Sequence, residues 1–217
     1  MKIAVIAANG RLGQAFVVAA LAAGHQVRAG IRGTSPFTKH PNLKTIECDA
    51  TDPADLLQLF TGQEVVVSAI GHVKNSAPDV QTIATQTTID IMHELGIKRF
   101  VDVTGTGVRF PGDKISLIDR FLNLGVGIVD PARVNDGKQH MEVLKKSDLD
   151  WTSVRVLKLQ NVQPSPFSLQ LHGPTKWYVG RTEVAQAMLQ VIERGSFIRQ
   201  SPIISRATNV QTDQLAT

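Results

Sequence analysis

The stretch IAVIAANGRLGQAFVVAALAAG, residues 3–24, decides the fold of this chain. Residues 3–7 form a continuous apolar run, which is typical of a strand buried on both faces of a sheet. Residues 10–23 then repeat their apolar side chains at helical spacing, and Gly24 stands where a C-terminal cap is expected. The chain therefore opens with a buried strand, a glycine turn and a helix.

The same alternation of short apolar runs and longer helical patterns continues to the end of the chain. It predicts strands over residues 26–31, 44–48, 64–70, 98–104, 151–156 and 201–205, and helices over residues 53–60, 79–95, 115–124, 131–146 and 181–194. Asp52 is the expected N-cap of the helix that begins at Pro53. Alternating strands and helices predict an α/β fold, namely a Rossmann-like, doubly wound parallel sheet in a single three-layer α/β/α domain.

Two segments depart from this alternation. Residues 160–180 hold Pro164, Pro166 and Pro174 and show no clear periodicity. A structureless stretch of that length inside a compact domain is usually a lid or a substrate wall, and a plain surface connection is an equally good interpretation. Residues 209–217 are polar and are expected to form a loose tail. We therefore expect one domain over residues 1–208, with a small substrate-side insertion at about 160–180.

Composition narrows the classes of function. The 217 residues are 42% hydrophobic and 19% charged, which suits one folded domain. Cys48 is the single cysteine, so a disulfide framework and a multi-cysteine zinc site are excluded. The net charge is +4, but the Lys and Arg residues are scattered, which argues against a nucleic-acid partner. No apolar run reaches the ~20 residues of a membrane span.

The start of the chain leaves no room for a signal peptide, because Lys2 leads directly into the first strand. Together with the single cysteine, this indicates a cytoplasmic protein in a reducing compartment, with no membrane partner. We expect a monomer or a homodimer. The histidines lack the spacing of a zinc-binding helix, so no metal site is expected either.

The turn Ala7-Ala8-Asn9-Gly10-Arg11-Leu12-Gly13 carries the first functional signal. A dinucleotide site needs a sharp turn, a close approach of the backbone to the pyrophosphate, and a helix N-terminus that points at the phosphates. Gly10 and Gly13 meet the last two needs, whereas Ala7 stands where a first glycine is usual. A tight strand–helix turn without a ligand is the alternative. If the site is real, Gly13→Val should abolish dinucleotide binding while the chain still folds.

The end of the second strand distinguishes the two nicotinamide dinucleotides. An acidic residue there would bind the ribose hydroxyls of NAD, but this chain has Arg28 within the strand and Arg32 at its end. A guanidinium can bind a 2′-phosphate through two hydrogen bonds and stack on adenine. Arg11 can add a second positive charge. The sequence therefore favours NADP(H) over NAD(H), with a solvated surface charge as the alternative interpretation of Arg32.

The order of several short motifs resembles the atypical short-chain dehydrogenases/reductases of the NAD(P)H-binding, NmrA-like type. Within that group it is most similar to the compact biliverdin-IXβ reductase/flavin reductase-like branch. The matching pieces span most of the chain. They lie at residues 7–13, 27–32, 48–52, 66–71, 97–108, 142–155 and 180–185.

The resemblance implies a role for each of several residues. Asp49 and Ala50 would lie under the adenine, and Ala69, Ile70 and Gly71 would follow the ribose and phosphates. Thr104 would stand beside the nicotinamide as the candidate catalytic hydroxyl. Val156 and Leu157, which follow Arg155, would close the substrate side.

The chain departs from the family in its candidate acid. The familiar dyad is Tyr-x-x-x-Lys, but Tyr178 is the single tyrosine and Thr182 follows it four positions later. Where the reductase branch often has two adjacent hydroxyl residues, this chain has Thr104 followed by a glycine, and Thr106 is the substitute. Hydride transfer to a flavin or quinone needs no strong protein acid, so the missing dyad is compatible with such an acceptor.

Other reactive side chains carry weaker signals. His72 follows the fourth strand and is a candidate substrate contact, with an ordinary loop histidine as the alternative. Cys48 is expected to be a packed small residue rather than a nucleophile. Ser68 has no nucleophile elbow around it, so a hydrolase is not indicated.

Two functions of different classes fit the sequence. The first is an NADPH-dependent reductase of a flavin, a quinone or a similar flat small-molecule acceptor. The second is a non-enzymatic NADP(H) sensor with a regulatory partner, as NmrA-like proteins can be, although we expect the chain to be too short for a partner-binding region. A sugar-nucleotide epimerase or dehydratase is a third option, which the missing dyad disfavours.

Overall fold

The computed structural model describes residues 1–73, 76–114 and 116–207. The strands are β1 Lys2–Ile6, β2 Gln26–Ile31, β3 Leu43–Glu47, β4 Val65–Ser68, β5 Arg99–Gly105, β6 Asp150–Val156, β7 Leu159–Gln160, β8 Phe167–Gln170, β9 Val179–Gly180 and β10 Ile203–Arg206. The helices are α1 Arg11–Ala22, α2 Pro53–Phe60, α3 Val80–Glu94, α4 Leu117–Val129, α5 Pro131–Lys146 and α6 Arg181–Glu193.

Eight of these strands form one central sheet. Their order is β3-β2-β1-β4-β5-β6-β10-β8. All neighbours are parallel except β8, which pairs antiparallel with β10 through the register Ile204↔Leu169. β10, the last strand among the described residues, thus lies between β6 and β8. The expected α/β fold with a doubly wound, Rossmann-like parallel sheet is confirmed, with β8 as an antiparallel addition at one edge.

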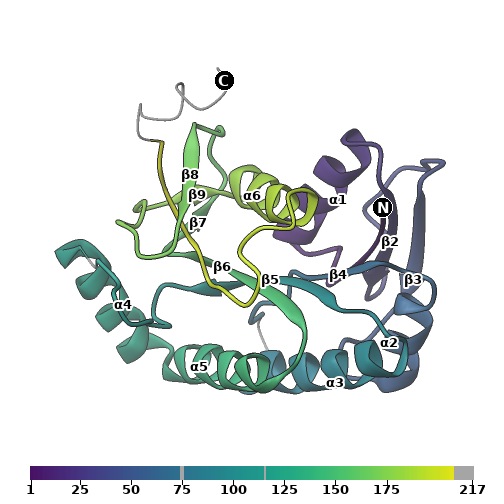
Figure 1. Cartoon of the computed structure of the whole chain (residues 1–217), viewed down its shortest axis with the longest axis horizontal. Helices are drawn as coiled ribbons and strands as arrows, with labels where there is room; N and C mark the ends of the chain where they lie inside the picture. Colours follow the sequence, from purple (N-terminus) through teal and green to yellow (C-terminus); the bar gives the residue numbers. More distant parts are fainter. Residues whose placement is uncertain (74–75, 115, 208–217) are drawn as a thin grey trace.

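Helices cover both faces of the sheet and give three layers. Helices α1 and α6 pack together on one face, and α2, α3 and α5 line the other (Figure 1). Each face has its own apolar core: Phe16 and Met188 lie buried on the α1/α6 side, and Phe60 and Met141 on the other. Because β1 and β4 are buried on both faces, their sequences are continuous apolar runs.

Helix ends follow the expected chemistry. Asp52 caps α2 by accepting hydrogen bonds from the amides of Ala54 and Asp55, as predicted. Gly24 and Gly96 end α1 and α3 with φ angles of 81° and 69°, which glycine adopts without the strain of a side chain. These local signals therefore fix one end of each of three helices, namely α1, α2 and α3.

Two expectations about local structure are wrong. The helix expected over residues 115–124 runs from Leu117 to Val129, so Gly125 lies within α4 rather than between two helices. Residues 160–180 are not structureless, since they contribute to β7, β8 and β9, and β8 pairs along the edge of the main sheet. The strands in this segment are only two to four residues long, so their apolar pattern cannot be recognised among the prolines and glycines. The expected tail at 209–217 lies outside the described residues.

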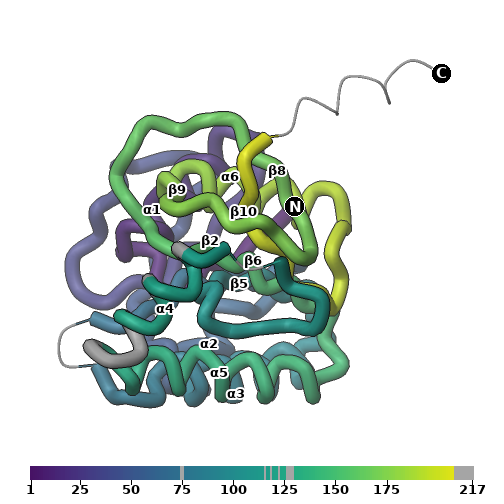
Figure 2. The backbone as a smooth tube through the Cα atoms, turned by 90° about the vertical axis from the view of Figure 1, so that its left-hand side faces the viewer, coloured from purple at the N-terminus to yellow at the C-terminus, as the bar shows by residue number. Residues whose placement is uncertain are grey.

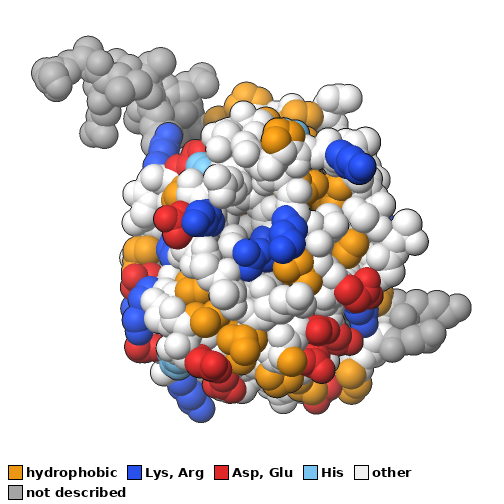
Figure 3. Space-filling view, turned by 90° about the vertical axis from the view of Figure 1, so that its right-hand side faces the viewer, with side chains coloured by type: hydrophobic (Ala, Val, Ile, Leu, Met, Phe, Trp, Pro, Cys, Tyr) orange, Lys and Arg blue, Asp and Glu red, His pale blue; other side chains and the backbone are white. Residues whose placement is uncertain are grey.

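The carboxyl ends of the parallel strands gather on one side of the molecule. This side carries α4 and the segment between β6 and α6, and it faces the viewer in Figure 2. On the opposite side, shown in Figure 3, Lys and Arg side chains lie among Asp and Glu rather than in one large patch. Ligands of open α/β sheets bind at the carboxyl edge, so the search for a site begins there.

Candidate functional site

The candidate site lies where the strand order reverses. β1 is hydrogen-bonded to both β2 and β4, and the connections that leave β1 and β4 run to opposite faces of the sheet. A crevice opens at such a switch point because the two outgoing segments diverge. Every strand-end segment named as a candidate from the sequence lies along this carboxyl edge.

The turn after β1 presents a helix N-terminus that no side chain caps. Ala7 adopts a left-handed backbone conformation with φ 55°, and the Gly10 amide donates to the Ala7 carbonyl at 3.0 Å. Gly10 is the N-cap of α1, without a side-chain hydrogen bond, and no acidic residue lies in the first turn. The first amides of α1 are therefore available to an anion, with the helix dipole in support.

Gly13 has a different role from the one expected. A Cβ atom there would stand 2.4 Å from the Ala7 carbonyl oxygen and 2.7 Å from Ala8 Cα. Gly13 thus permits α1 to pack closely on β1, so Gly13→Val must shift the helix and is expected to lower the stability of the fold as well as dinucleotide binding. Leu12 is also a packing residue, since its side chain is buried in the α1/α6 core. Only its backbone can reach a ligand.

The ends of β2 and β3 bring Arg32 and Asp49 together. The Asn9 side chain donates to the Arg32 carbonyl at 2.8 Å, which ties this corner to the glycine turn. The Arg32 guanidinium is 66% exposed and lies 3.8 Å from Asp49 Oδ2. Hydrogen bonds from the Thr51 amide and hydroxyl hold the pKa of Asp49 below its usual value. A cation and a carboxylate therefore face solvent at the corner where an adenosine would lie.

Arg28, the other candidate cation of β2, is used elsewhere. Its guanidinium donates to the carbonyls of Gln58, Leu59 and Thr61 at the end of α2. These are the carbonyls that a helix leaves without partners. Arg28 therefore stabilises a helix terminus, and Arg32 is the exposed arginine at this strand end.

The segment after β4 continues the edge of the sheet. The Ala69 amide donates to the Ile6 carbonyl at 3.2 Å, and the Gln81 side chain donates to the Ile70 carbonyl at 3.1 Å. A Cβ atom on Gly71 would meet nothing within 4 Å, so open space adjoins this residue. Ala50, at the end of β3, is half-buried against the core on the α2/α3 side.

The ends of β5 and β6 hold the candidate nicotinamide-side residues. Thr104 is 5% exposed and packs beside Gly137 of α5, and its hydroxyl has no hydrogen-bond partner within the described part of the chain. Thr106 is buried, and its hydroxyl accepts from Asn123 of α4 at 3.1 Å. Val156 is a core residue and Leu157 is half-buried. Thr104 is thus the candidate with an uncommitted hydroxyl.

The His72 ring pairs with a buried carboxylate. Its Nε2 lies 2.8 Å from Asp136 Oδ2, and its side chain is 9% exposed. Asp136, on α5, also accepts from the amides of Gln81 and Thr82 and so caps α3 from a distance. Burial alone raises the pKa of Asp136, but the hydrogen bonds from Thr82, Gln81 and His72 lower it below its usual value. His72 thus joins α3 to α5 and has no free Nε2 for a substrate.

Arg155 is a structural centre that the sequence reasoning did not identify. Its side chain is 1% exposed, and all five of its N–H groups are used. Two pair with Asp113 at 2.6 and 2.9 Å, and three reach the carbonyls of Val108, Leu171 and Ser201. An arginine inside an apolar strand signals a buried partner, but nothing local identifies Asp113.

A second buried ion pair lies beside the first turn of α6. Lys176 Nζ donates to Glu183 Oε2 at 2.6 Å and to Ser165 Oγ at 2.7 Å. On the same turn, burial and the nearby charge of Arg11 lower the pKa of Arg181. The first turn of α6 therefore adjoins both the glycine turn and the segment between β7 and β9.

Cys48 and the possible metal ligands complete the set of reactive side chains. Burial and nearby carboxylates raise the pKa of the Cys48 thiol to about 12, so it is not a nucleophile. In the described ranges, no group of three or more His, Cys, Asp or Glu side chains could hold a metal ion. Among the helices of those same residues, none is long and apolar enough to cross a membrane.

Comparisons with known proteins agree with this geometry. The NAD(P)H-binding family matches residues 7–194. Among curated proteins, none matches this sequence closely enough to count as a relative.

Several solved structures share the fold. A short-chain dehydrogenase/reductase from Veillonella parvula, in complex with NADP, is 20% identical with a TM-score of 0.78, and covers 94% of each chain. ChuY, an anaerobillin reductase from Escherichia coli O157:H7, is 18% identical with a TM-score of 0.75, over 95% of this chain and 97% of its own. A Burkholderia pseudomallei protein whose name describes it as exported is 26% identical with a TM-score of 0.77, over 94% and 98%.

Proposed function

Because this chain belongs to the NAD(P)H-binding family, we propose that it is an NADPH-dependent reductase whose hydride acceptor is a flavin, a quinone or a similar flat small molecule. The observation that carries the proposal is the uncapped N-terminus of α1 at the switch point between β1 and β4. The alternative of a non-enzymatic NADP(H) sensor is separated from it by the experiments below.

The residues at the carboxyl edge fit a dinucleotide. The amides at the start of α1 and the guanidinium of Arg11 suit a pyrophosphate, and the open space beside Gly71 leaves room along the ribose. Asp49 and Ala50 suit the adenosine end. When bound, NADPH supplies a hydride, that is, a proton with two electrons. Thr104 would hold the nicotinamide side through its uncommitted hydroxyl, and solvent would supply the proton that completes reduction.

Arg32 supports NADP(H) over NAD(H). Its exposed guanidinium stands at the end of β2, where a 2′-phosphate would lie, and its neighbour Asp49 at 3.8 Å leaves its donors largely free. The similar fold of the Veillonella parvula protein, which is crystallised with NADP, is consistent with this preference.

The experiment for the cofactor compares Arg32→Glu with the matched control Arg194→Glu at the far end of α6. We expect Arg32→Glu to weaken NADPH binding by about 10- to 100-fold, because a charged hydrogen bond of about 1.5–3 kcal/mol is lost. NADH binding should change by less than about threefold, and Arg194→Glu should change neither. Titration calorimetry measures the six constants, for both cofactors with the native chain and with each variant. Equal losses for NADPH and NADH in Arg32→Glu would refute the assignment of Arg32.

The experiment for the activity follows NADPH oxidation with FMN, riboflavin, quinones and biliverdin as acceptors. Turnover with any of them supports the reductase. Tight NADPH binding in the same sample without any turnover supports the sensor. Thr104→Val keeps the shape of the side chain but removes its hydroxyl, so it should lower kcat while the binding constant of NADPH changes little.

A further inference from the structure

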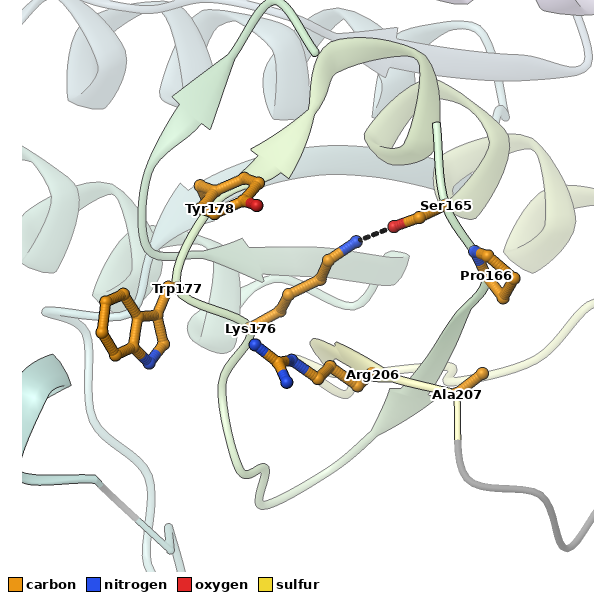
Figure 4. Close-up of a pocket in the computed structure, with 7 residues that line it drawn as sticks. All are labelled: Ser165, Pro166, Lys176, Trp177, Tyr178, Arg206 and Ala207. Carbon is orange, nitrogen blue, oxygen red and sulfur yellow. Dashed lines mark hydrogen bonds between the residues drawn. The ribbon is translucent and has the colours of Figure 1, made fainter. Parts of the chain in front are cut away.

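A cavity opens beyond the carboxyl end of β6, on the segment that connects β7 to α6. Its volume is about 410 Å³, which lies within the ~300–1,000 Å³ range of small-molecule sites. Its walls are Ser165, Pro166, Lys176, Trp177, Tyr178, Arg206 and Ala207 (Figure 4). None of these residues was assigned to the cofactor, so the cavity is a separate feature of the site.

Two adjacent aromatic residues line the cavity, and Tyr178 directs its ring toward Lys176, whereas the Trp177 ring points away from the other lining side chains (Figure 4). Trp177 is 51% exposed and Tyr178 is 46% exposed, although large aromatic side chains are usually buried. The backbone around them is fixed: the Lys176 amide donates to the Ile204 carbonyl at 3.1 Å, and the Val179 amide donates to the Lys158 carbonyl at 2.9 Å. The exposed Tyr178 ring, on a fixed backbone, offers a face on which a planar ligand can stack.

Positive charge faces the same cavity. Lys176 is 9% exposed and extends across it to Ser165, while Arg206 enters from β10 (Figure 4). Glu183 neutralises Lys176 from behind and is itself 1% exposed, so it does not line the cavity. Among the described residues, no carboxylate forms an ion pair with Arg206. The lining thus carries one positive charge in excess, on a guanidinium that suits a carboxylate, phosphate or sulfonate group.

The cavity adjoins the predicted substrate side of the cofactor site. Tyr178 precedes Val179, and Val179 is hydrogen-bonded to Lys158, the residue directly after Leu157. The buried Lys176–Glu183 pair fixes this wall to the first turn of α6, which also carries Arg181 beside Arg11. A ligand in this cavity would therefore lie next to the edge at which the nicotinamide is expected.

From this arrangement we infer that the cavity binds the hydride acceptor, and that this acceptor is a planar aromatic molecule with an anionic group. The aromatic part stacks on Tyr178, and the anionic group pairs with Arg206. The inference rests on the proposed reductase function and deepens it, because it separates anionic acceptors from neutral ones of the same ring system.

The test uses two pairs of probes that differ in a single anionic group: FMN with riboflavin, and menadione sulfonate with menadione. Binding to the full chain with NADP⁺ present is measured by equilibrium dialysis, independently of turnover. In the native protein, we expect at least one anionic probe to bind about 10-fold more tightly than its neutral counterpart. A charged hydrogen bond of about 1.5–3 kcal/mol corresponds to a factor of that size or larger.

Arg206→Gln removes the charge from an exposed side chain. It should reduce the preference for the anionic probe to less than about twofold and leave the neutral probe unchanged, because only the charge–charge interaction is lost. Arg194→Gln, the matched exposed arginine, should keep the full preference. Tyr178→Leu should weaken the anionic and neutral probes alike, since both use the ring. Circular dichroism of each variant excludes unfolding as the cause.

Equal binding of the two members of both pairs overturns the inference, as does a preference that survives in Arg206→Gln. Failure of every probe to bind also overturns it. The proposed function fails in a different way. If the anionic preference depends on Arg206 but NADPH is never oxidised, the cavity is a binding site and the protein is not a reductase of these acceptors.

Discussion

The two halves of the carboxyl edge are built by different means. In the half formed by β1–β4, the cofactor half, the features that suit a ligand are backbone features: a left-handed Ala7, an uncapped α1 and the open space at Gly71. In the half formed by β5, β6, β10 and the segments between them, the substrate half, buried ion pairs hold the loops. Arg155 pairs with Asp113, and Lys176 pairs with Glu183.

The difference explains why a short motif indicates one half and not the other. A backbone turn is complete within a few residues, so its glycines and its helix follow each other in the sequence. Arg155 and Asp113 lie 42 positions apart, and Arg155 also reaches a carbonyl 46 positions away. A short motif therefore indicates the cofactor half, whereas no local pattern in the sequence indicates the ion pairs of the substrate half.

The sharpest test of the substrate half is Arg155→Met. This change leaves the Asp113 carboxylate buried without its partner and removes the donors to three carbonyls. Loss of one partner of a buried pair costs about 3–5 kcal/mol, so we expect the free energy of unfolding to fall by that amount. Urea denaturation followed by circular dichroism measures it.

The matched control for Arg155→Met is Arg194→Met, on the exposed end of α6. We expect it to change the free energy of unfolding by less than about 0.5 kcal/mol, as surface substitutions usually do. A loss below 1 kcal/mol in Arg155→Met would contradict the claim that ion pairs hold the substrate half.

The corresponding test of the cofactor half is Gly13→Val. Because a Cβ atom would stand 2.4 Å from the Ala7 carbonyl oxygen, the helix must move away from β1. Overpacking of this kind costs about 1–3 kcal/mol, and we expect both a lower unfolding midpoint and weaker NADPH binding. Gly125→Ala, on α4 and away from the proposed cofactor site, is the control, since a Cβ atom there meets nothing within 4 Å. If Gly13→Val were as stable as the native chain, the close packing described here would be refuted.

Acid should act on the substrate half through Asp113. Burial alone raises the pKa of Asp113, but hydrogen bonds from Arg155 and from the Phe110 amide lower it below its ordinary value of 3.8. The stability that this carboxylate provides is thus present above pH 3.8 and is lost as the pH falls through the lower folded-state pKa.

Unfolding measured between pH 2 and pH 5 tests this effect, which spans roughly the range over which paired carboxylates titrate. Asp113→Asn should start less stable and show a shallower loss in acid than the native chain. Asp49→Asn, whose carboxylate is half-exposed in the cofactor half, should change the slope less. The same slope in the native chain and in Asp113→Asn would contradict the prediction.

The smallest effect is expected at Ala7. Its φ of 55° costs an L-residue about 1–2 kcal/mol, while glycine loses about 0.4–1 kcal/mol more backbone entropy on folding. Ala7→Gly should therefore stabilise the chain by about 0.5–1 kcal/mol, and NADPH binding should stay within about twofold. Ala23→Gly, at a residue with φ of −81°, should not stabilise it. A destabilised Ala7→Gly would show that the turn tolerates alanine without strain.

The sequence indicated the sheet, most helix bounds and the cofactor edge, because each depends on local patterns such as the apolar run of β1 or Pro53 after Asp52. It did not indicate the ion pairs, because a partner such as Asp113 is chosen by the fold and not by its neighbours in the chain. His72 illustrates the same limit. Its place after β4 suggested a substrate contact, but its ring is hydrogen-bonded to Asp136, which lies 64 positions later.

The position of β10 between β6 and β8 has a consequence for how the chain is made. During synthesis, Arg155 and β8 emerge well before Ile203–Arg206, the strand that pairs with both β6 and β8. Until Ile203–Arg206 leave the ribosome, the backbone N–H and C=O groups along one side of β6 and along β8 have no strand partner. Arg155 Nε likewise lacks the Ser201 carbonyl that accepts its hydrogen bond. The cofactor half can assemble before β10 is made, whereas the substrate half must wait for Ile203–Arg206.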